Sequence, residues 1–486
     1  MSTPGRPAQR LVVAAGALAV VALLLFLPQT RPPSLMRDFN AFYCAGAALD
    51  RGADPYRNEP LGSCERAPRA AWLNRGIPNL AAPAPLPPYA LAPFRVLAYL
   101  PYEAAALAWG LVVLAAFGLT IWALRSVTRL PLIGLIAAFA LVDGLAGWTL
   151  GQVAPLAVAA IALAVYFIEA GRDRAAAVAV AFAMIEPHVA LPAALALFAW
   201  RRQTRFPLVA AGAACLALSF LTAGWNLNLE YVQSVLPAHA ASEIASNRQL
   251  SLTNLAYRFG ANDVLALRLG DASYLAMLAA GVLLAPVLAR RAGAGMLVAL
   301  PVAFVLCGGP FAHVVQTAAA LPCALLLYAR VPQVRLPLGI ALAALAVPWA
   351  QFSSLGALFP ALAALAVACV VWAFVDRRPL AIALGAALAS VYLIAIDASV
   401  TTRIPDPAGA LARAYDPHAL AQASWGLYVQ NVATWNVLAF DLARLPAWFG
   451  LIAIVAVGVR VAFPAPDENF ARCENGGTTS RRIPSR

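Results

Sequence analysis

Long apolar stretches alternate with short arginine-bearing turns along most of this chain. Residues 11–27, for example, carry no charge and are long enough to cross most of a bilayer. Inside a bilayer every backbone polar group must be satisfied internally, so such stretches fold as helices. With 62% hydrophobic residues, 12% charged residues and a mean hydropathy of +0.77, the chain is predicted to be an all-α polytopic membrane protein.

The arginines set the predicted orientation, since the chain contains no lysine. They cluster in short turns that follow apolar stretches: Arg125 and Arg129; Arg172 and Arg174; Arg201, Arg202 and Arg205; Arg290 and Arg291; Arg330 and Arg335; Arg377 and Arg378. The positive-inside rule places these turns in the cytoplasm. We therefore predict a bundle of roughly twelve transmembrane helices with both ends inside. Residues 1–463 form one domain in this interpretation, and 464–486 a cytoplasmic, disordered tail.

Residues 175–200 require a special arrangement in this topology. A single helix over this stretch could cross the membrane, but it would leave the following arginines outside. A re-entrant hairpin, with its tip at Glu186, Pro187 and His188, keeps them inside, and proline is a natural breaking point. We favour the hairpin, and the single crossing remains the alternative.

The outer face then carries four segments, 28–101, 224–271, the turn 308–313 and 397–446. Asp38 lies at the start of the first, on a predicted short helix, and a carboxylate beside the membrane is a candidate catalyst. The alternative is a solvated residue on a helix that anchors the loop. Cys44 and Cys64 are the only cysteines in the predicted outer loops, which makes them a candidate disulfide pair.

Other polar residues mark candidate binding positions. Tyr89 belongs to the proline-broken apolar segment 86–94, which fits the membrane interface and suits either a lipid-borne substrate or a plain aromatic belt. Gln152, Glu186 and His188 lie within apolar surroundings, where polar residues point to function unless they only join helices by hydrogen bonds.

Cationic residues occur in two further outer segments. Arg248 and Arg258 flank a stretch rich in amide and hydroxyl groups, and arginine forks bind phosphate oxygens bidentately. Alternatively, both arginines extend to lipid headgroups. His313 follows Gly308, Gly309 and Pro310 at a predicted helix start, where the helix dipole favours an anion.

These pieces occur in an order that resembles glycosyltransferase family 87, which comprises enzymes dependent on polyprenyl-phosphate sugars. The matching residues are Asp38 with 42–46, then 52–56, 87–89, 151–152, 187–188, 247–258 and 310–313. The resemblance implies a GT-C-like fold, a catalytic carboxylate at Asp38 and mannose as the sugar. The chain departs from the family in having Glu186 where lysine is usual, and in lacking a tryptophan and a second histidine near His313.

The expected chemistry agrees with these residues. A sugar on a polyprenyl phosphate is already activated, so the enzyme needs a base for the acceptor hydroxyl and cations for the departing phosphate. We assign Asp38 as the base and Arg258, supported by Arg248 and His313, to the phosphate. The predicted substrate pocket comprises Tyr43, Tyr56, Tyr89, Gln152, Glu186, His188, Asn247 and Gln249. No cysteine or histidine spacing predicts a metal site, and no glycine-rich nucleotide loop occurs, so we expect neither metal nor cofactor.

The sequence thus predicts a bacterial inner-membrane enzyme that transfers a hexose, with inversion, from polyprenyl phosphate to an outer-facing lipid or glycan acceptor. Nucleic acid is not an expected partner, because no basic cluster is interleaved with aromatics. One rival interpretation is a transporter or flippase of a lipid-linked or small polar substrate. A transporter should gather its polar residues at the membrane midplane, whereas these lie towards one face. A glycan polymerase or ligase, which would not need Asp38, is a second rival.

Overall fold

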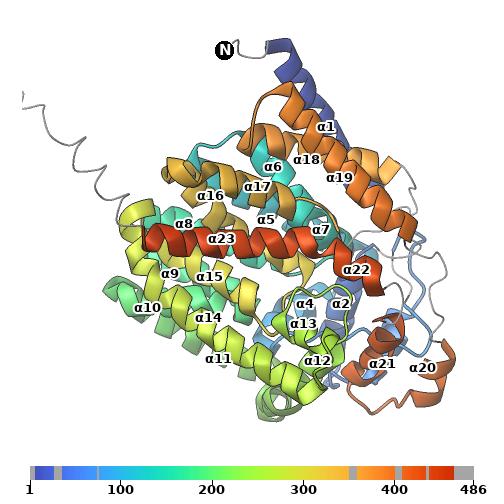
Figure 1. Ribbon diagram of the computed structural model, residues 1–486. Coiled ribbons are helices and arrows are strands. Elements are labelled where there is room, and N and C mark those ends of the chain that lie inside the picture. Colours follow the sequence, from blue (N-terminus) through green and yellow to red (C-terminus); the bar gives the residue numbers. More distant parts are fainter. Residues whose placement is uncertain are drawn as a thin grey trace, which may run out of the picture.

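The computed structural model describes residues 6–26, 35–73, 76–349, 358–399, 408–433 and 437–464. Within these ranges the chain is all-helical, as predicted, and its only strand-like pairings are two isolated bridges. Figure 1 shows long helices packed side by side and a group of short helices at one end. The predicted tail lies outside the described residues, apart from its first residue, as does the start of the first predicted outer loop.

Five helical segments of the described chain are long and apolar enough to cross a membrane. They are α5 (Tyr102–Thr128); α11 (Arg202–Glu230) continued by η3 (Tyr231–Val235) and α12 (Leu236–Glu243); α14 (Asp263–Ala292); α19 (Pro379–Ser399); and α22 (Val437–Ala443) with α23 (Leu445–Ala462). Further apolar helices accompany them: α1 (Arg6–Phe26), α6 (Leu132–Phe139), α8 (Ala154–Glu169), α10 (Pro187–Trp200), α15 (Met296–Gly308), α16 (Leu321–Arg330), α17 (Arg335–Leu345) and α18 (Leu358–Phe374).

The predicted count of twelve crossings is therefore not confirmed. The stretch 131–149 is helical without a gap, as α6, a π-helical turn η2 (Ala140–Gly144) and α7 (Leu145–Leu150). Other predicted crossings are short helices: α8 has 16 residues, α15 has 13 and α17 has 11. A helix needs about 20 residues to span the hydrocarbon core, so such pieces do not span it individually.

The segment 175–200 forms a hairpin. Its arms are α9 (Asp173–Ala183) and α10, and proline occupies the first turn of the second arm. Arg201 Nη1, just after the second arm, lies 3.9 Å from Asp173 Oδ2 at the start of the first. The chain therefore leaves and returns at the same end of the bundle, which confirms the hairpin over the single crossing.

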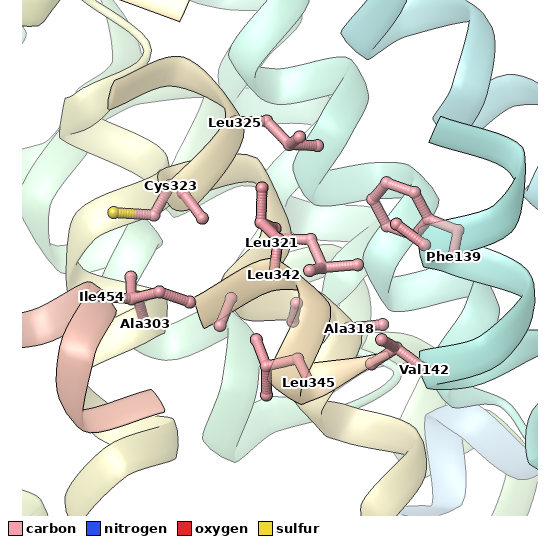
Figure 2. Close-up of a cluster of buried hydrophobic side chains, with 14 of the residues drawn as sticks. Phe139, Val142, Ala303, Ala318, Leu321, Cys323, Leu325, Leu342, Leu345 and Ile454 are labelled. Carbon is pink, nitrogen blue, oxygen red and sulfur yellow. The ribbon is translucent and has the colours of Figure 1, made fainter. Parts of the chain in front are cut away.

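The apolar interior lies where the mid-chain helices cross (Figure 2). Phe139 of α6, Leu321 and Leu325 of α16, Leu342 of α17 and Ile454 of α23 are fully buried there. Alanines, among them Ala303 and Ala318, fill the closest approaches. Small residues let helix backbones approach, and such packing is a main source of helix association in lipid.

Three of the predicted inner turns meet at one end of the bundle. Glu169, the last residue of α8, accepts hydrogen bonds from Arg330 Nη1 at 2.7 Å and Nη2 at 2.8 Å. The same carboxylate accepts from the Gly295 backbone at 2.6 Å, and Arg330 also donates to the carbonyl of Ala292. This paired fork ties the end of α8, the α14–α15 turn and the end of α16, which continues into η5 (Pro332–Val334).

Short helices from the predicted outer segments gather at the other end of the bundle, at the lower right of Figure 1. They are α2 (Arg37–Asp50), α3 (Asn58–Glu65), α4 (Pro88–Leu97), α13 (Leu252–Arg258), α20 (Ala408–Ala414) and α21 (Ala421–Ala433). Two sets of backbone hydrogen bonds join distant segments here. Ala421 donates to Tyr56 at 2.8 Å and Asn58 to Ala419 at 2.9 Å, while Leu250 donates to Ala312 at 2.7 Å.

Candidate functional site

The first turn of α2 is docked on the turn between α7 and α8. The backbone N–H of Met36, which has a left-handed φ of 59°, donates to the Thr149 carbonyl at 2.8 Å. The buried ring of Phe39 packs against four aromatic rings, those of Tyr43, Phe94, Tyr102 and Trp109. Asp38 lies between these anchors, where the helix dipole favours a carboxylate.

Gly151 brings Gln152 to Asp38. The side-chain amide of Gln152 donates a hydrogen bond to the Asp38 carboxylate. Gly151 has a φ of +69°, and a Cβ at this position would lie 2.7 Å from both Met36 Sδ and Phe39 Cβ. Only glycine combines this left-handed backbone with so close an approach to α2.

Burial and the neighbouring charges have opposite effects on the pKa of Asp38. Burial raises the pKa of Asp38 above its usual range, although the positive charges of Arg37, His313 and Arg248 and the Gln152 hydrogen bond act in the opposite direction. A carboxylate with a raised pKa is a stronger base than an ordinary aspartate. Asp38 is therefore equipped to accept a proton.

Arg248 and His313 reach Asp38 because their two segments are paired. An isolated antiparallel bridge joins Gln249 to His313, and the backbone N–H of Leu250 donates a hydrogen bond to the carbonyl of Ala312. The Arg248 side chain is exposed, yet desolvation by surrounding protein lowers its pKa. Its guanidinium group is thus accessible from solvent, although protein groups lie around it.

Glu243 and Trp425 lie on the other side of His313. The buried Glu243 accepts a hydrogen bond from the Trp425 indole, and its other carboxylate oxygen lies 4.0 Å from His313 Nε2. Trp425 belongs to α21, so the C-terminal part of the chain reaches the neighbourhood of Asp38.

Arg37, next to Asp38, is stacked on α21. Its guanidinium carbon lies 5.2 Å from the ring centroid of Trp425 and 5.5 Å from that of Tyr428, within the range of cation–π contacts. Burial would raise the pKa of Tyr428, but the charges of Arg37 and Arg248 outweigh it, so the pKa is lowered. The two arginines thus border the same tyrosine.

The tip of the α9–α10 hairpin adjoins this group. Gln316 Nε2 donates to the Glu186 carboxylate at 3.1 Å, and His188 Nδ1 lies 3.6 Å from the same carboxylate. The rings of His188 and His313 both pack edge-on against Phe311. Glu186 and His188 are thereby placed beside the site, one residue layer away from His313.

Tyr89 and Gln249 connect segments around the site. The Tyr89 hydroxyl donates to the Met184 carbonyl at 2.7 Å, which fixes α4 to the hairpin tip. Gln249 accepts from Ser251 through its side chain at 2.8 Å and from Arg444 through its backbone at 2.9 Å. These contacts hold the frame of the site.

Arg258 is engaged away from Asp38. It donates to the Asn247 side chain, and its Nε lies 4.0 Å from Asp441 of α22. The charges that act on Asp38 are those of Arg37, His313 and Arg248. Arg258 thus lies outside the group of charges that acts on Asp38, and its predicted role stays a prediction.

Residues of the first loop mainly build its framework. The Tyr43 hydroxyl donates to the Leu100 carbonyl at 2.9 Å, and the buried Tyr56 hydroxyl donates to the Leu86 carbonyl at 3.0 Å. Cys44 and Cys64 are joined in a disulfide, with Cα atoms 5.7 Å apart. The bond fastens α2 to the end of α3.

Comparison with known protein families supports one interpretation of this geometry. Residues 86–315 match glycosyltransferase family 87. The resemblance seen in the sequence is thereby confirmed over these residues, and the family indicates a membrane glycosyltransferase. No curated protein matches the chain.

The family 87 match includes Gln152, Arg248 and His313, whereas Asp38 and α21 lie outside it. No group of three or more metal-ligating side chains suited to a metal ion occurs in the described ranges. Sequence reasoning missed four residues at the site: Arg37, Glu243, Trp425 and Tyr428. Arg37 could have been found as the neighbour of Asp38, and the two aromatics by their three-residue spacing in an outer loop.

Proposed function

We propose that the protein transfers a hexose, mannose by family analogy, from a polyprenyl-phosphate sugar to a hydroxyl group of a lipid or glycan acceptor. We place the reaction on the outer face of a bacterial inner membrane, in a GT-C-like fold. One observation carries the proposal: Asp38, a carboxylate with a raised pKa, is held by Gln152 and lies within the influence of three cationic side chains.

The proposed reaction is a single displacement. The acceptor oxygen attacks C1 of the sugar, and the bond from C1 to the phosphate oxygen breaks. The electron pair of that bond leaves with polyprenyl phosphate, while the hydroxyl proton passes to Asp38. Arg248 and His313 stabilise the negative charge that develops on the leaving group. Attack from the face opposite the phosphate inverts the anomeric centre.

Purified protein in nanodiscs, supplied with a panel of labelled polyprenyl-phosphate sugars and lipid acceptors, tests the proposal. Product lipids are separated by thin-layer chromatography and identified by mass spectrometry. We expect Asp38→Asn to lower turnover about a hundredfold or more, because an amide of the same shape does not accept the proton.

Asp50→Asn is the matched control, since Asp50 is exposed at the other end of α2 and lies 3.7 Å from Arg95. It should leave turnover unchanged. Normal transfer by folded Asp38→Asn would contradict the assigned base. A different outcome is that the unmodified protein transfers no sugar in this assay and yet moves lipid-linked sugar across the membrane of proteoliposomes. That result would contradict the glycosyltransferase proposal and support a flippase.

A further inference from the structure

Two guanidinium groups that act on Asp38 have donors without acceptors, although the Arg37 group also interacts with the Tyr428 hydroxyl. Nη2 of Arg37 is buried and has no hydrogen-bond partner among the described residues. The Arg248 side chain forms no hydrogen bond and no ion pair with any residue that the structure describes. A buried donor such as Arg37 Nη2 is seldom left unsatisfied within protein, whereas the exposed fork of Arg248 is open to a ligand that arrives from outside.

The neighbouring carboxylates are engaged elsewhere. Asp38 accepts its hydrogen bond from Gln152. Glu243 accepts from Trp425 and lies near His313. Two like charges that border one tyrosine repel each other, and an anion placed between them would relieve the repulsion.

Arg37 is also oriented in advance. The rings of Trp425 and Tyr428 hold its guanidinium plane, and the Trp425 indole is itself fixed by Glu243. Holding a flexible side chain before the ligand arrives reduces the entropy lost on binding. Such support is expected of a ligand-binding arginine rather than of one that only extends into solvent.

We propose that Arg37 and Arg248 together bind one phosphate group of the lipid-linked donor, and that Trp425 and Tyr428 hold Arg37 in position for this contact. The inference rests on the proposed function and assigns the phosphate to a site completed by α21. Phosphate oxygens accept bidentate hydrogen bonds from both forks, and the position beside Asp38 puts the leaving group next to the base.

The test measures binding rather than transfer. The probe is a short-chain polyprenyl monophosphate, with the matching polyprenol as the uncharged reference, titrated calorimetrically into protein in phosphatidylcholine nanodiscs. We expect Arg37→Gln and Arg248→Gln each to weaken phosphate-dependent binding at least tenfold. Arg51→Gln, at the exposed end of the same helix α2, is the matched control and should bind normally.

The double variant Arg37→Gln/Arg248→Gln tests whether both residues grip one phosphate. Residues that share a ligand are coupled, so the loss should be smaller than the product of the two single losses. Fully multiplicative losses would mean two separate anions and would overturn the joint site. Arg37→Lys keeps the charge without the planar fork, so its affinity for the phosphate probe should lie between those of the unmodified protein and Arg37→Gln. This variant also tests the site if Arg37→Gln does not fold.

The aromatic support has its own readout. Trp425→Phe should weaken phosphate binding in the unmodified protein but have no further effect in the Arg37→Gln background. An equal loss in both backgrounds would show that Trp425 does not act through Arg37.

The outcomes separate this site from the proposed function. Normal phosphate binding by folded Arg37→Gln, in a protein that transfers sugar, overturns the site and leaves the function intact. Arginine-dependent phosphate binding without sugar transfer from any donor supports the site and contradicts the function. Displacement of the probe by phosphatidylglycerol at equal mole fraction would identify a headgroup site and overturn the assignment to the donor.

Discussion

Gly151→Ala provides a quantitative test of how α2 is fixed to the α7–α8 turn. Alanine in a left-handed conformation costs about 1 to 2 kcal/mol. The added methyl group would also lie 2.7 Å from Met36 Sδ and Phe39 Cβ. The methionine end can move, but the Phe39 Cβ moves only with the helix, and overpacking of this kind costs about 1 to 3 kcal/mol.

Gly171→Ala is the control that carries the backbone strain alone, so the difference between the two variants measures the overpacking. Gly171 has a φ of +70°, close to the +69° of Gly151, and nothing lies within 4 Å of the position that an added methyl group would take there. Both variants therefore carry the same backbone strain, while only Gly151→Ala displaces α2. We expect a loss of about 2 to 5 kcal/mol for Gly151→Ala and of about 1 to 2 kcal/mol for Gly171→Ala.

Activity should separate the two variants more clearly than stability. Displacement of the turn moves Gln152 relative to Asp38, and misplacement of a catalytic group by about 1 Å can cost a hundredfold in rate. Thermal unfolding in detergent and initial rates with a labelled donor measure the two effects. Equal melting temperatures and equal turnover in both variants would refute the argument that close approach at Gly151 positions the base.

Three further predictions concern ionisation and the first loop. Arg248→Gln removes a positive charge that lowers the pKa of Asp38, so the acid limb of kcat/KM should move to higher pH; an unmoved limb in a folded variant would place Arg248 away from the base. Burial raises the pKa of Glu65 from 4.5 to about 8, so stability should fall as the pH rises between these values, and Glu65→Gln should flatten this slope in thermal scans at a series of pH values. Replacement of both Cys44 and Cys64 by serine should lower the free energy of unfolding by about 3 kcal/mol for a loop of this length. Reductant should lower the melting temperature of the unmodified protein but not that of the serine variant. If reductant affected both proteins equally, the disulfide would be excluded.

The sequence predicted those parts of the site that local chemistry marks. Asp38, Gln152, Arg248 and His313 stand out as polar residues at the edges of apolar stretches, and the structure brings them together. The hairpin was predictable because Pro187 breaks a helix and the arginines that follow it favour one side.

Long-range partners escaped prediction for a physical reason. Nothing near Arg258 in the chain predicts the proximity of Asp441, which lies 183 positions later in the sequence and 4.0 Å from Arg258 Nε. The stacking of Trp425 on Arg37 likewise depends on how the two ends of the chain pack. The number of crossings was not recoverable either, because hydropathy does not show where a helix ends inside an apolar stretch, as it does in α15 and α17.

The pairing of residues 56–59 with 417–421 has a consequence for biosynthesis. Asp38 leaves the ribosome early, but the strand-like contact that frames its loop forms only after the Ala419 and Ala421 backbones have been made. Until then the nascent protein carries its acidic group without the aromatic cover of α21. The loop that carries Asp38 therefore reaches its final contacts only at the end of translation, and under the proposed function a chain that stops short of α21 is expected to lack sugar transfer.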